Sequence, residues 1–203
     1  MKIDFKKQLT CYKASRKLEI IEVPKLQYLM IDGFGDPNAS KMYQDALHTL
    51  YPVAYKLKFI SKNLNKDFVV MPLEGLWWAD QMDSFTSARD KSQWHWTMMI
   101  MQPSHITPEM LKDAKLKLAQ QKDAPPLLDD IRLEYLNEAT SVQVLHVGSY
   151  DDEADILAKM HHEFIPENKL KMVGKHHEIY LSDPRKISPE KLKTILRQPV
   201  ENL

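Results

Sequence analysis

Two stretches of the chain follow the same order of elements, and this order constrains the fold more than any other feature of the sequence. Residues 27–31 form a short apolar run before a glycine turn and a helical pattern, and residues 143–147 form a similar run before Gly148 and a second helical pattern. Each helical pattern leads to a strand-like segment that carries an acid, Glu74 or Glu178. The simplest structure with this order is a duplicated strand-helix-strand-strand unit, whose two copies form one α+β domain with a central ligand cleft.

The remaining patterns place the expected elements along the chain. Strands are expected at 27–31, 68–79, 94–102, 131–136, 141–147 and 178–181, helices at 40–57, 107–118, 151–164 and from Ser188 onward, and a loop at 80–93. Pro52 lies inside the first helix, where a proline removes a hydrogen bond at a cost of about 3 kcal/mol, so it predicts a kink or a restart near Tyr51. We expect an N-terminal extension at 1–22 and one domain at 23–203, with repeats at about 23–102 and 130–186.

Composition excludes several classes of protein. In 203 residues, 28 lysines and arginines balance 28 aspartates and glutamates, so no overall positive field favours nucleic acid or an anionic membrane. Cys11 is the only cysteine, which rules out an internal disulfide and leaves an ordinary thiol. The first residues lack the apolar core of a signal peptide, and no apolar run reaches the length of a bilayer span. We expect a cytoplasmic protein with no direct contact to nucleic acid or membrane.

All four tryptophans lie close together in the sequence and close to an acid. They are Trp77 and Trp78, which follow Glu74, and Trp94 and Trp96. A second acid-bearing segment, His176-His177-Glu178-Ile179-Tyr180, comes late in the chain. Tryptophans are often simply part of a core, but an aliphatic core has little use for carboxylates. We therefore expect the two segments to wall one pocket that takes a flat, apolar ligand.

Strand geometry limits which of these side chains can share a pocket. Successive side chains of a strand point to opposite faces, so Glu74 shares its face with Trp78 and not with Trp77. By the same rule Glu178 and Tyr180 share a face of their strand. A glutamate held among aromatic rings can act as a general base or acid, or it can attract a cationic ligand. The sequence leaves both roles open.

Metal, phosphate and nucleotide sites are not indicated. The segments His161-His162-Glu163 and His176-His177-Glu178 hold adjacent histidines, which point in different directions, and not two histidines one helical turn apart. The five glycines form neither a phosphate-binding loop nor a dinucleotide fingerprint, and the chain has no serine nucleophile elbow. We predict no metal and no cofactor.

Several motifs, spread over nearly the whole chain, carry a family resemblance. They are Asp32-Gly33-Phe34-Gly35-Asp36-Pro37-Asn38, Pro72-Leu73-Glu74-Gly75-Leu76-Trp77-Trp78, Trp94-His95-Trp96-Thr97, Gln102-Pro103, His146-Val147-Gly148-Ser149-Tyr150-Asp151-Asp152-Glu153 and His176-His177-Glu178-Ile179-Tyr180-Leu181-Ser182-Asp183-Pro184-Arg185-Lys186. Together they resemble the stand-alone GyrI-like small-molecule-binding proteins. One departure is Ser149, because members of the family more often carry proline before the tyrosine.

The resemblance implies a fold and an activity. The fold is a duplicated α+β module of the SOUL/GyrI-like type, also found as the effector-binding part of multidrug-sensing transcription regulators and in the gyrase inhibitor itself. Some stand-alone members with the Trp-rich and His-His-Glu-Ile-Tyr patterns are cyclopropanoid hydrolases, which add water to the strained cyclopropane of DNA-alkylating natural products and so detoxify them. The expected substrate is therefore a small, flat, aromatic electrophile.

This chemistry assigns roles to the residues. Adding water to the cyclopropane needs a base, a proton donor for the developing phenolate, and aromatic walls. Glu178 is the expected base, with Glu74 as its weaker counterpart. The donor candidates are Tyr55, taken as catalytic, and Tyr150 and Tyr180, taken as ligand-binding, while the expected walls are Trp96, Trp78, Trp94 and Trp77 in falling order. His146 either lines the cleft or is a satisfied core histidine.

Two other functions compete with hydrolysis. A passive binding protein would sequester hydrophobic or cationic molecules, or inhibit a partner such as gyrase, and would form no product. A transcription regulator would need an attached DNA-binding domain, and the 22 polar residues before Val23 are too few for a helix-turn-helix. We expect hydrolysis, with passive binding as the alternative.

Overall fold

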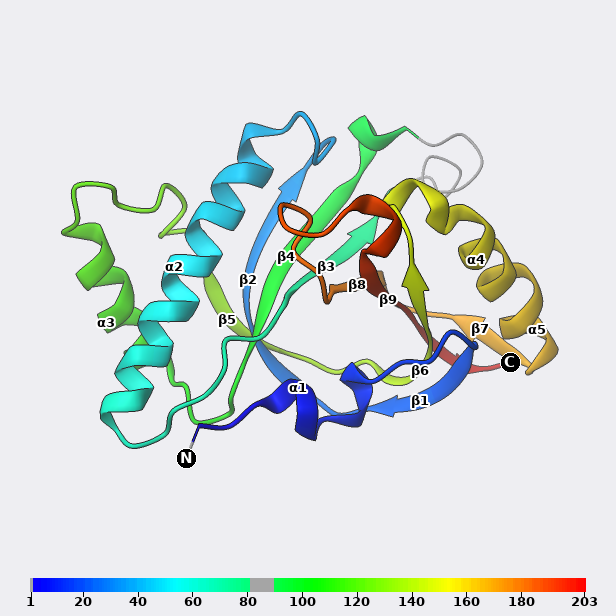
Figure 1. Cartoon of the computed structure of the whole chain (residues 1–203), viewed down its shortest axis with the longest axis horizontal. Helices are drawn as coiled ribbons and strands as arrows, with labels where there is room; N and C mark the ends of the chain where they lie inside the picture. Colours follow the sequence, from blue (N-terminus) through cyan, green and yellow to red (C-terminus); the bar gives the residue numbers. More distant parts are fainter. Residues whose placement is uncertain (1, 81–89) are drawn as a thin grey trace.

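A large antiparallel sheet is the centre of the computed structural model, which describes residues 2–80 and 90–203 (Figure 1). Its strands in this described part are β1 (Glu19–Val23), β2 (Leu26–Phe34), β3 (Leu73–Trp78), β4 (His95–Gln102), β5 (Arg132–Leu136), β6 (Ala139–Val147), β7 (Leu170–Met172), β8 (His176–Tyr180) and β9 (Lys193–Asn202). They are ordered β1-β6-β9-β8-β3-β4-β2-β5, and β7 pairs with β9. Residues 81–89, most of the segment expected to be a loop, lie outside the described residues.

Five α-helices are described beside the sheet in residues 2–80 and 90–203. They are α1 (Phe5–Gln8), α2 (Lys41–Asn63), α3 (Pro108–Ala119), α4 (Ala154–Lys159) and α5 (Ile165–Glu167), with a π-helical segment, Met160–Phe164, between the last two. The Ser40 side chain accepts a hydrogen bond from the backbone N–H of Tyr43 and so caps α2. Thr107 caps α3 in the same way. In the described ranges, no helix combines the length and the apolar character needed to cross a bilayer.

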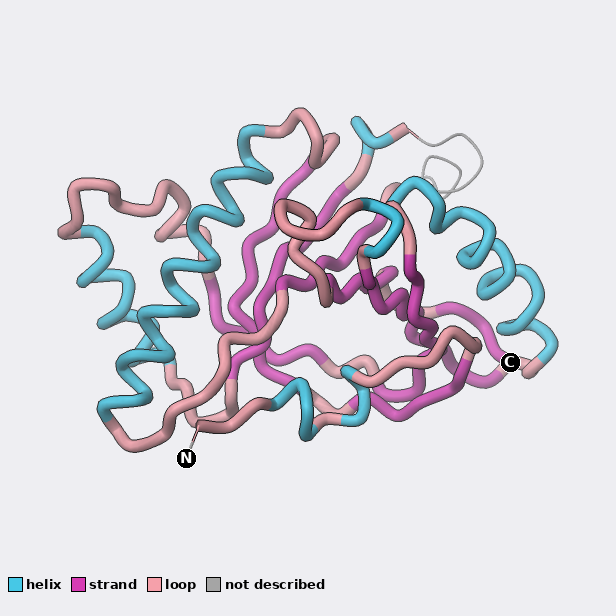
Figure 2. Tube along the Cα trace, viewed as in Figure 1, coloured by secondary structure: helices cyan, strands magenta, loops and turns pink. Residues whose placement is uncertain are grey.

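The sheet is built from two copies of one unit, as the sequence predicts. The first copy is β2, α2, β3 and β4, and the second is β6, α4, β8 and β9. Strands β3 and β8 pair at the centre. In each unit the last strand lies between the other two, with β4 between β2 and β3 and β9 between β6 and β8. Figures 1 and 2 show α2 beside one half of the sheet and α4 with α5 beside the other. The predicted α+β fold with a duplicated module is confirmed.

The helices of both copies cover the same face of the sheet. The Tyr43 ring on α2 packs edge-on against Trp96 of β4, with centroids 5.3 Å apart. Met160 of the π-helical segment belongs to a buried cluster with Val144 of β6 and Leu196 of β9. Trp96 pairs with Trp77, and Trp77 with His176 of β8. Two residues further along β8, on the same side, Glu178 pairs with Leu196, which pairs with Val144. The side chains of Trp96, Val144 and Leu196 therefore point to one face of the sheet. We call this the helix face and the other the N-terminal face, because Tyr12 covers part of it.

The predicted end of the chain is wrong. Only a short 3-10 turn, Pro189–Lys191, follows Ser188, and the long strand β9 replaces the expected helix. Its residues 194–200 are all buried, and three of them, Thr194, Ile195 and Val200, are β-branched, so burial at the sheet centre overrides the helix-start signal. The second copy therefore runs through β9 to Asn202, and β5 pairs with β2 of the first copy.

The expected division at residue 22 has no counterpart in the structure. Strand β1 pairs with β6 along its whole length, and Cys11 and Tyr12 are buried in the main core. The described residues before Val23 are therefore part of the domain. The expected restart near Tyr51 does not occur, because α2 continues through Pro52 as one helix.

Candidate functional site

The two acids expected to share a pocket lie on opposite faces of the sheet. Glu178 pairs directly with Gly75, and His176 pairs with Trp77, so all four point to the helix face. Glu74 is the neighbour of Gly75 and points to the N-terminal face. The prediction that Glu74 and Glu178 wall one pocket is wrong, because the register of β3 with β8 sets Glu178 beside a glycine.

Glu178 is held by a chain of hydrogen bonds on the helix face. The Tyr180 hydroxyl donates to Oε2 of Glu178 at 2.7 Å. The indole Nε1–H of Trp77 donates to the Tyr180 oxygen at 3.0 Å. The other carboxylate oxygen, Oε1, lies 3.6 Å from Nε2 of His176, and the side chain of Glu178 stays 13% exposed. The Tyr180 hydroxyl thus orients the carboxylate, which stays partly exposed to solvent.

Three tyrosines stand beside this carboxylate. Burial and the Glu178 charge raise the pKa of Tyr180 well above its usual range. The same two causes, in the same order, raise the pKa of Tyr43 and raise that of Tyr150 to about 12. Tyr150 meets Tyr180 edge to face, with ring centroids 5.7 Å apart. All three hydroxyls therefore keep their protons at neutral pH and can donate them.

The tryptophans are mainly core. Trp96, the first expected wall, is 0% exposed, and Trp77 and Trp94 are buried and meet edge to face at 5.7 Å. Trp78 is half-buried, but its ring stacks on His95 at 5.5 Å, and Nζ of Lys175 lies 3.2 Å from its centroid. The core explanation therefore holds for Trp96, whereas Trp77 takes part in the site through its N–H group.

Two further residues were expected at the site, Tyr55 as a proton donor and His146 in the cleft, and they lie in different places. Tyr55 is 49% exposed on α2, on a different side of the helix from the buried stripe of Leu50, Val53, Ala54 and Leu57. His146 lies on the helix face, and its Nε2 is 3.0 Å from the carbonyl oxygen of Ser149. The tyrosine of α2 that does reach the site is Tyr43. The signal for it was present in the sequence. Apolar residues repeat there at three- and four-residue steps, as Tyr43, Ala46, Leu47, Leu50, Tyr51, Ala54 and Leu57, and Tyr55 is not one of them.

Glu74 belongs to a buried polar network on the N-terminal face. The Tyr12 hydroxyl donates to Glu74 at 2.5 Å, and Nε2 of His177 lies 2.9 Å from the other oxygen. Nδ1 of His177 lies 2.9 Å from Glu138, which accepts from Arg197 at 2.9 Å. Burial alone would lower the pKa of His177, but the two carboxylates raise it, so the ring is an imidazolium that donates to both. Both carboxylate oxygens of Glu74 are thus occupied by hydrogen bonds within the protein, which indicates a structural role for this residue.

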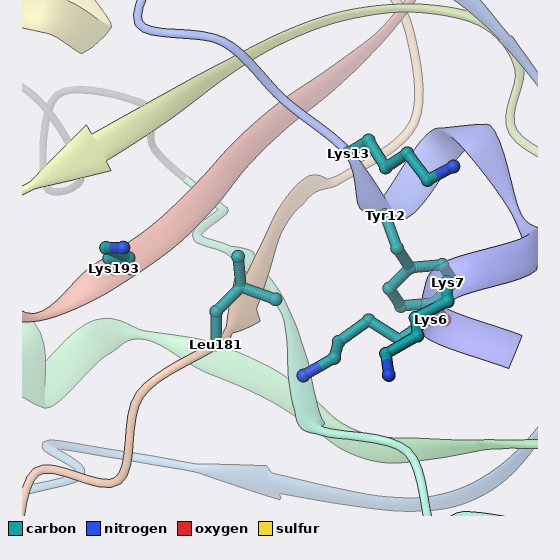
Figure 3. A pocket seen from close by; sticks show the side chains of 6 residues that line it. All are labelled: Lys6, Lys7, Tyr12, Lys13, Leu181 and Lys193. Atoms are coloured by element: carbon teal, nitrogen blue, oxygen red, sulfur yellow. The ribbon is translucent and has the colours of Figure 1, made fainter. Parts of the chain in front are cut away.

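Two cavities lie at different places on the sheet. One, of about 560 Å³, opens on the N-terminal side, where Figure 3 shows Tyr12, Lys6, Lys7 and Lys13 across from Leu181 and Lys193. The other, of about 240 Å³, lies where β3 ends and β8 begins. Its walls are Trp77, Trp78, His161, Met172, Gly174, Lys175, His176 and Gln198. It reaches His176, the residue whose ring faces Glu178. Within 2–80 and 90–203, no three His, Cys, Asp or Glu side chains are grouped as a metal ion would need.

Comparisons with known proteins show the family and the fold of the chain. The model of the GyrI-like small molecule binding domain matches residues 16–201. An uncharacterized conserved protein from Listeria innocua is 40% identical, with a TM-score of 0.90 over 98% of this chain and 100% of that one. A hydrolase from Listeria innocua is 41% identical, with a TM-score of 0.88 over 99% of this chain and 100% of that one. The C-terminal domain of EcmrR, 13% identical with a TM-score of 0.55 over 92% of this chain and 98% of that one, shares the fold alone. No protein with a curated description matches the chain.

Proposed function

The chain belongs to the GyrI-like small-molecule-binding family, and we propose that it is a hydrolase that opens the cyclopropane ring of flat aromatic electrophiles by adding water. The observation that carries the proposal is the oriented carboxylate of Glu178, which accepts a hydrogen bond from Tyr180 and remains partly exposed to solvent. Likeness to solved structures called hydrolases, at 41% identity, supports the reaction type. The cyclopropane and its removal as detoxification follow from the motif resemblance.

The reaction needs a base beside water and a donor beside the opposite end of the substrate. Glu178 takes a proton from water while the water oxygen forms a bond to the cyclopropyl methylene carbon. The strained carbon–carbon bond breaks, and its electron pair passes into the conjugated ketone, which becomes a phenolate. A tyrosine gives its proton to this oxygen, and the proton on Glu178 then restores the tyrosine through solvent. The product is the substrate plus one water.

Tyr150 is the tyrosine best placed to protonate the phenolate. The Tyr180 hydroxyl already donates to Glu178, so its role is to orient the base. Tyr150 is half-buried, meets the Tyr180 ring, and has a pKa of about 12, so it is protonated when the substrate arrives. Tyr55 is left out of this scheme because it is 49% exposed on α2.

The proposal is tested by incubating the purified protein with an aromatic ketone that carries a fused cyclopropane. We expect a product heavier by one water, detected by mass spectrometry, and incorporation of heavy oxygen when the reaction runs in labelled water. Quenching of tryptophan fluorescence with no product above the protein-free rate would contradict hydrolysis and favour a protein that sequesters aromatic compounds. This second function is compatible with the same residues, because binding alone needs no base.

A further inference from the structure

The 240 Å³ cavity at the ends of β3 and β8 has the walls of an aromatic-binding site. Trp77, Trp78 and Met172 give it apolar and polarisable surfaces. Gly174, in the turn before β8, also lines it and has a φ of +65°, a backbone conformation that glycine adopts without strain. The volume of the cavity is below that of typical drug-sized pockets, so the cavity suits a ligand of one or two fused rings.

His161 supplies a buried polar atom to this cavity, whose walls also include Lys175, His176 and Gln198. The residue is 6% exposed, and its Nε2 has no hydrogen-bond partner among the described residues. Leaving a buried polar atom unpaired costs about 1–3 kcal/mol, so such atoms in a native protein call for an explanation. The ring also lies in the π-helical segment between α4 and α5, and single π-helical turns occur frequently at functional sites. A ligand with a hydrogen-bonding edge accounts for the cavity, the unpaired nitrogen and the irregular helix together.

We propose that this cavity binds a flat bicyclic aromatic group, of the size of an indole, and that Nε2 of His161 accepts a hydrogen bond from the N–H edge of that group. Burial, together with the neighbouring His176 and His162, lowers the pKa of His161 to about 4. The imidazole is therefore neutral near pH 7, and with its proton on Nδ1 it presents a lone pair on Nε2.

The cavity is connected to the proposed base through His176. The His176 ring forms one wall, 6.2 Å between centroids from His161, and its Nε2 lies 3.6 Å from Oε1 of Glu178. A ring system seated on His161 therefore contacts the His176 ring, which in turn lies beside the Glu178 carboxylate. That this group is the aromatic end of the substrate rests on the proposed function, whereas binding in the cavity does not.

Three ligands of nearly equal size test the proposal by isothermal titration calorimetry. Indole carries an N–H donor, benzothiophene has sulfur in its place, and quinoline carries an acceptor nitrogen. We expect indole to bind the wild-type protein about 3- to 10-fold more tightly than benzothiophene, the range of one net hydrogen bond. His161→Phe should keep the ring volume and remove this preference. His162→Phe, which changes the adjacent exposed histidine, should retain it.

Equal affinities for indole and benzothiophene in the wild-type protein, a preference for quinoline, or no binding of any of the three would overturn the proposal. Should His161→Phe fail to fold, the ring-nitrogen NMR signals of the wild-type protein decide. Indole must then shift the Nε2 resonance of His161, and an unchanged resonance at saturation would also overturn it. Repeating the titration with Glu178→Gln separates the two claims, because this variant should lose hydrolysis and keep its preference for indole.

Discussion

At the scale of single residues, the contact between Gly33 and Trp96 shows why Trp96 belongs to the core and does not form the wall of a ligand pocket. The two residues pair directly between β2 and β4, and the Trp96 ring lies over the Gly33 backbone. A Cβ atom at position 33 would come within 2.0 Å of Cη2 of this ring. The indole N–H of Trp96 also donates to the carbonyl of Gly35 at 3.3 Å. The missing side chain of Gly33 is therefore part of how Trp96 is packed.

This packing predicts that Gly33→Ala lowers the free energy of unfolding by about 1–3 kcal/mol, the usual cost of overfilling a packed core. In a Trp96→Leu background, the smaller side chain leaves room for the methyl group, so the cost of Gly33→Ala should fall. Urea denaturation followed by circular dichroism measures the four variants of this cycle. Strictly additive effects would contradict the contact between the two residues.

At the scale of elements, a buried network of ion pairs and hydrogen bonds on the N-terminal face connects three strands and two adjoining segments. Its members come from the segment before β1 (Tyr12), from β3 (Glu74), β8 (His177) and β9 (Arg197), and from Glu138 just before β6. Two carboxylates and two cations balance in charge, and each is hydrogen-bonded. Removing one member of such a set leaves an uncompensated buried charge, which costs about 3–5 kcal/mol.

Glu138 makes the network sensitive to acid. Burial alone would raise the pKa of Glu138, but His177 and Arg197 lower it from its ordinary value of 4.5 to about 2. A lowered folded-state pKa contributes stability above the ordinary value, and this contribution is lost as the pH falls from about 4.5 to 2. We predict that the free energy of unfolding decreases over this interval and that Glu138→Gln reduces the decrease while destabilising the protein by about 3 kcal/mol at pH 7.

Denaturation curves at several pH values between 2 and 7 test this prediction. Glu167→Gln, which changes an exposed acid on α5, is the matched control and should behave as the wild type. The same acid dependence in Glu138→Gln and in wild type would show that the network does not hold the pKa of this residue down.

The sequence was informative about elements and less so about their ends. The strand-glycine-helix order at 27–31 and 143–147 predicted the duplicated unit because periodicity and turn residues are local signals. Strand β9 was missed because Ser188, Pro189 and Glu190 form a regular helix start, although only a 3-10 turn follows. Its strand state comes from pairing with β6, β7 and β8, which no local pattern records.

At the scale of the whole molecule, the register between the two copies determines which acid faces the helices. Sequence alternation correctly separated Trp77 from Glu74, and it correctly joined Glu178 with Tyr180. It could not show that Glu178 sits beside Gly75, because the register between β3 and β8 is a long-range property. One face consequently holds a partly exposed, hydrogen-bonded carboxylate, and the other holds a buried, charge-balanced network.

The central claim is that Glu178, on the helix face, is the base of a hydrolase, whereas Glu74, on the N-terminal face, has a structural role. Its most direct test is the turnover of a cyclopropane-bearing aromatic ketone by Glu178→Gln, with Glu167→Gln as the control. We predict a loss of about 10²- to 10⁴-fold in kcat, the usual contribution of a general base, with unfolding behaviour unchanged. Turnover by Glu178→Gln equal to that of the wild type would remove Glu178 from the chemistry and contradict the account.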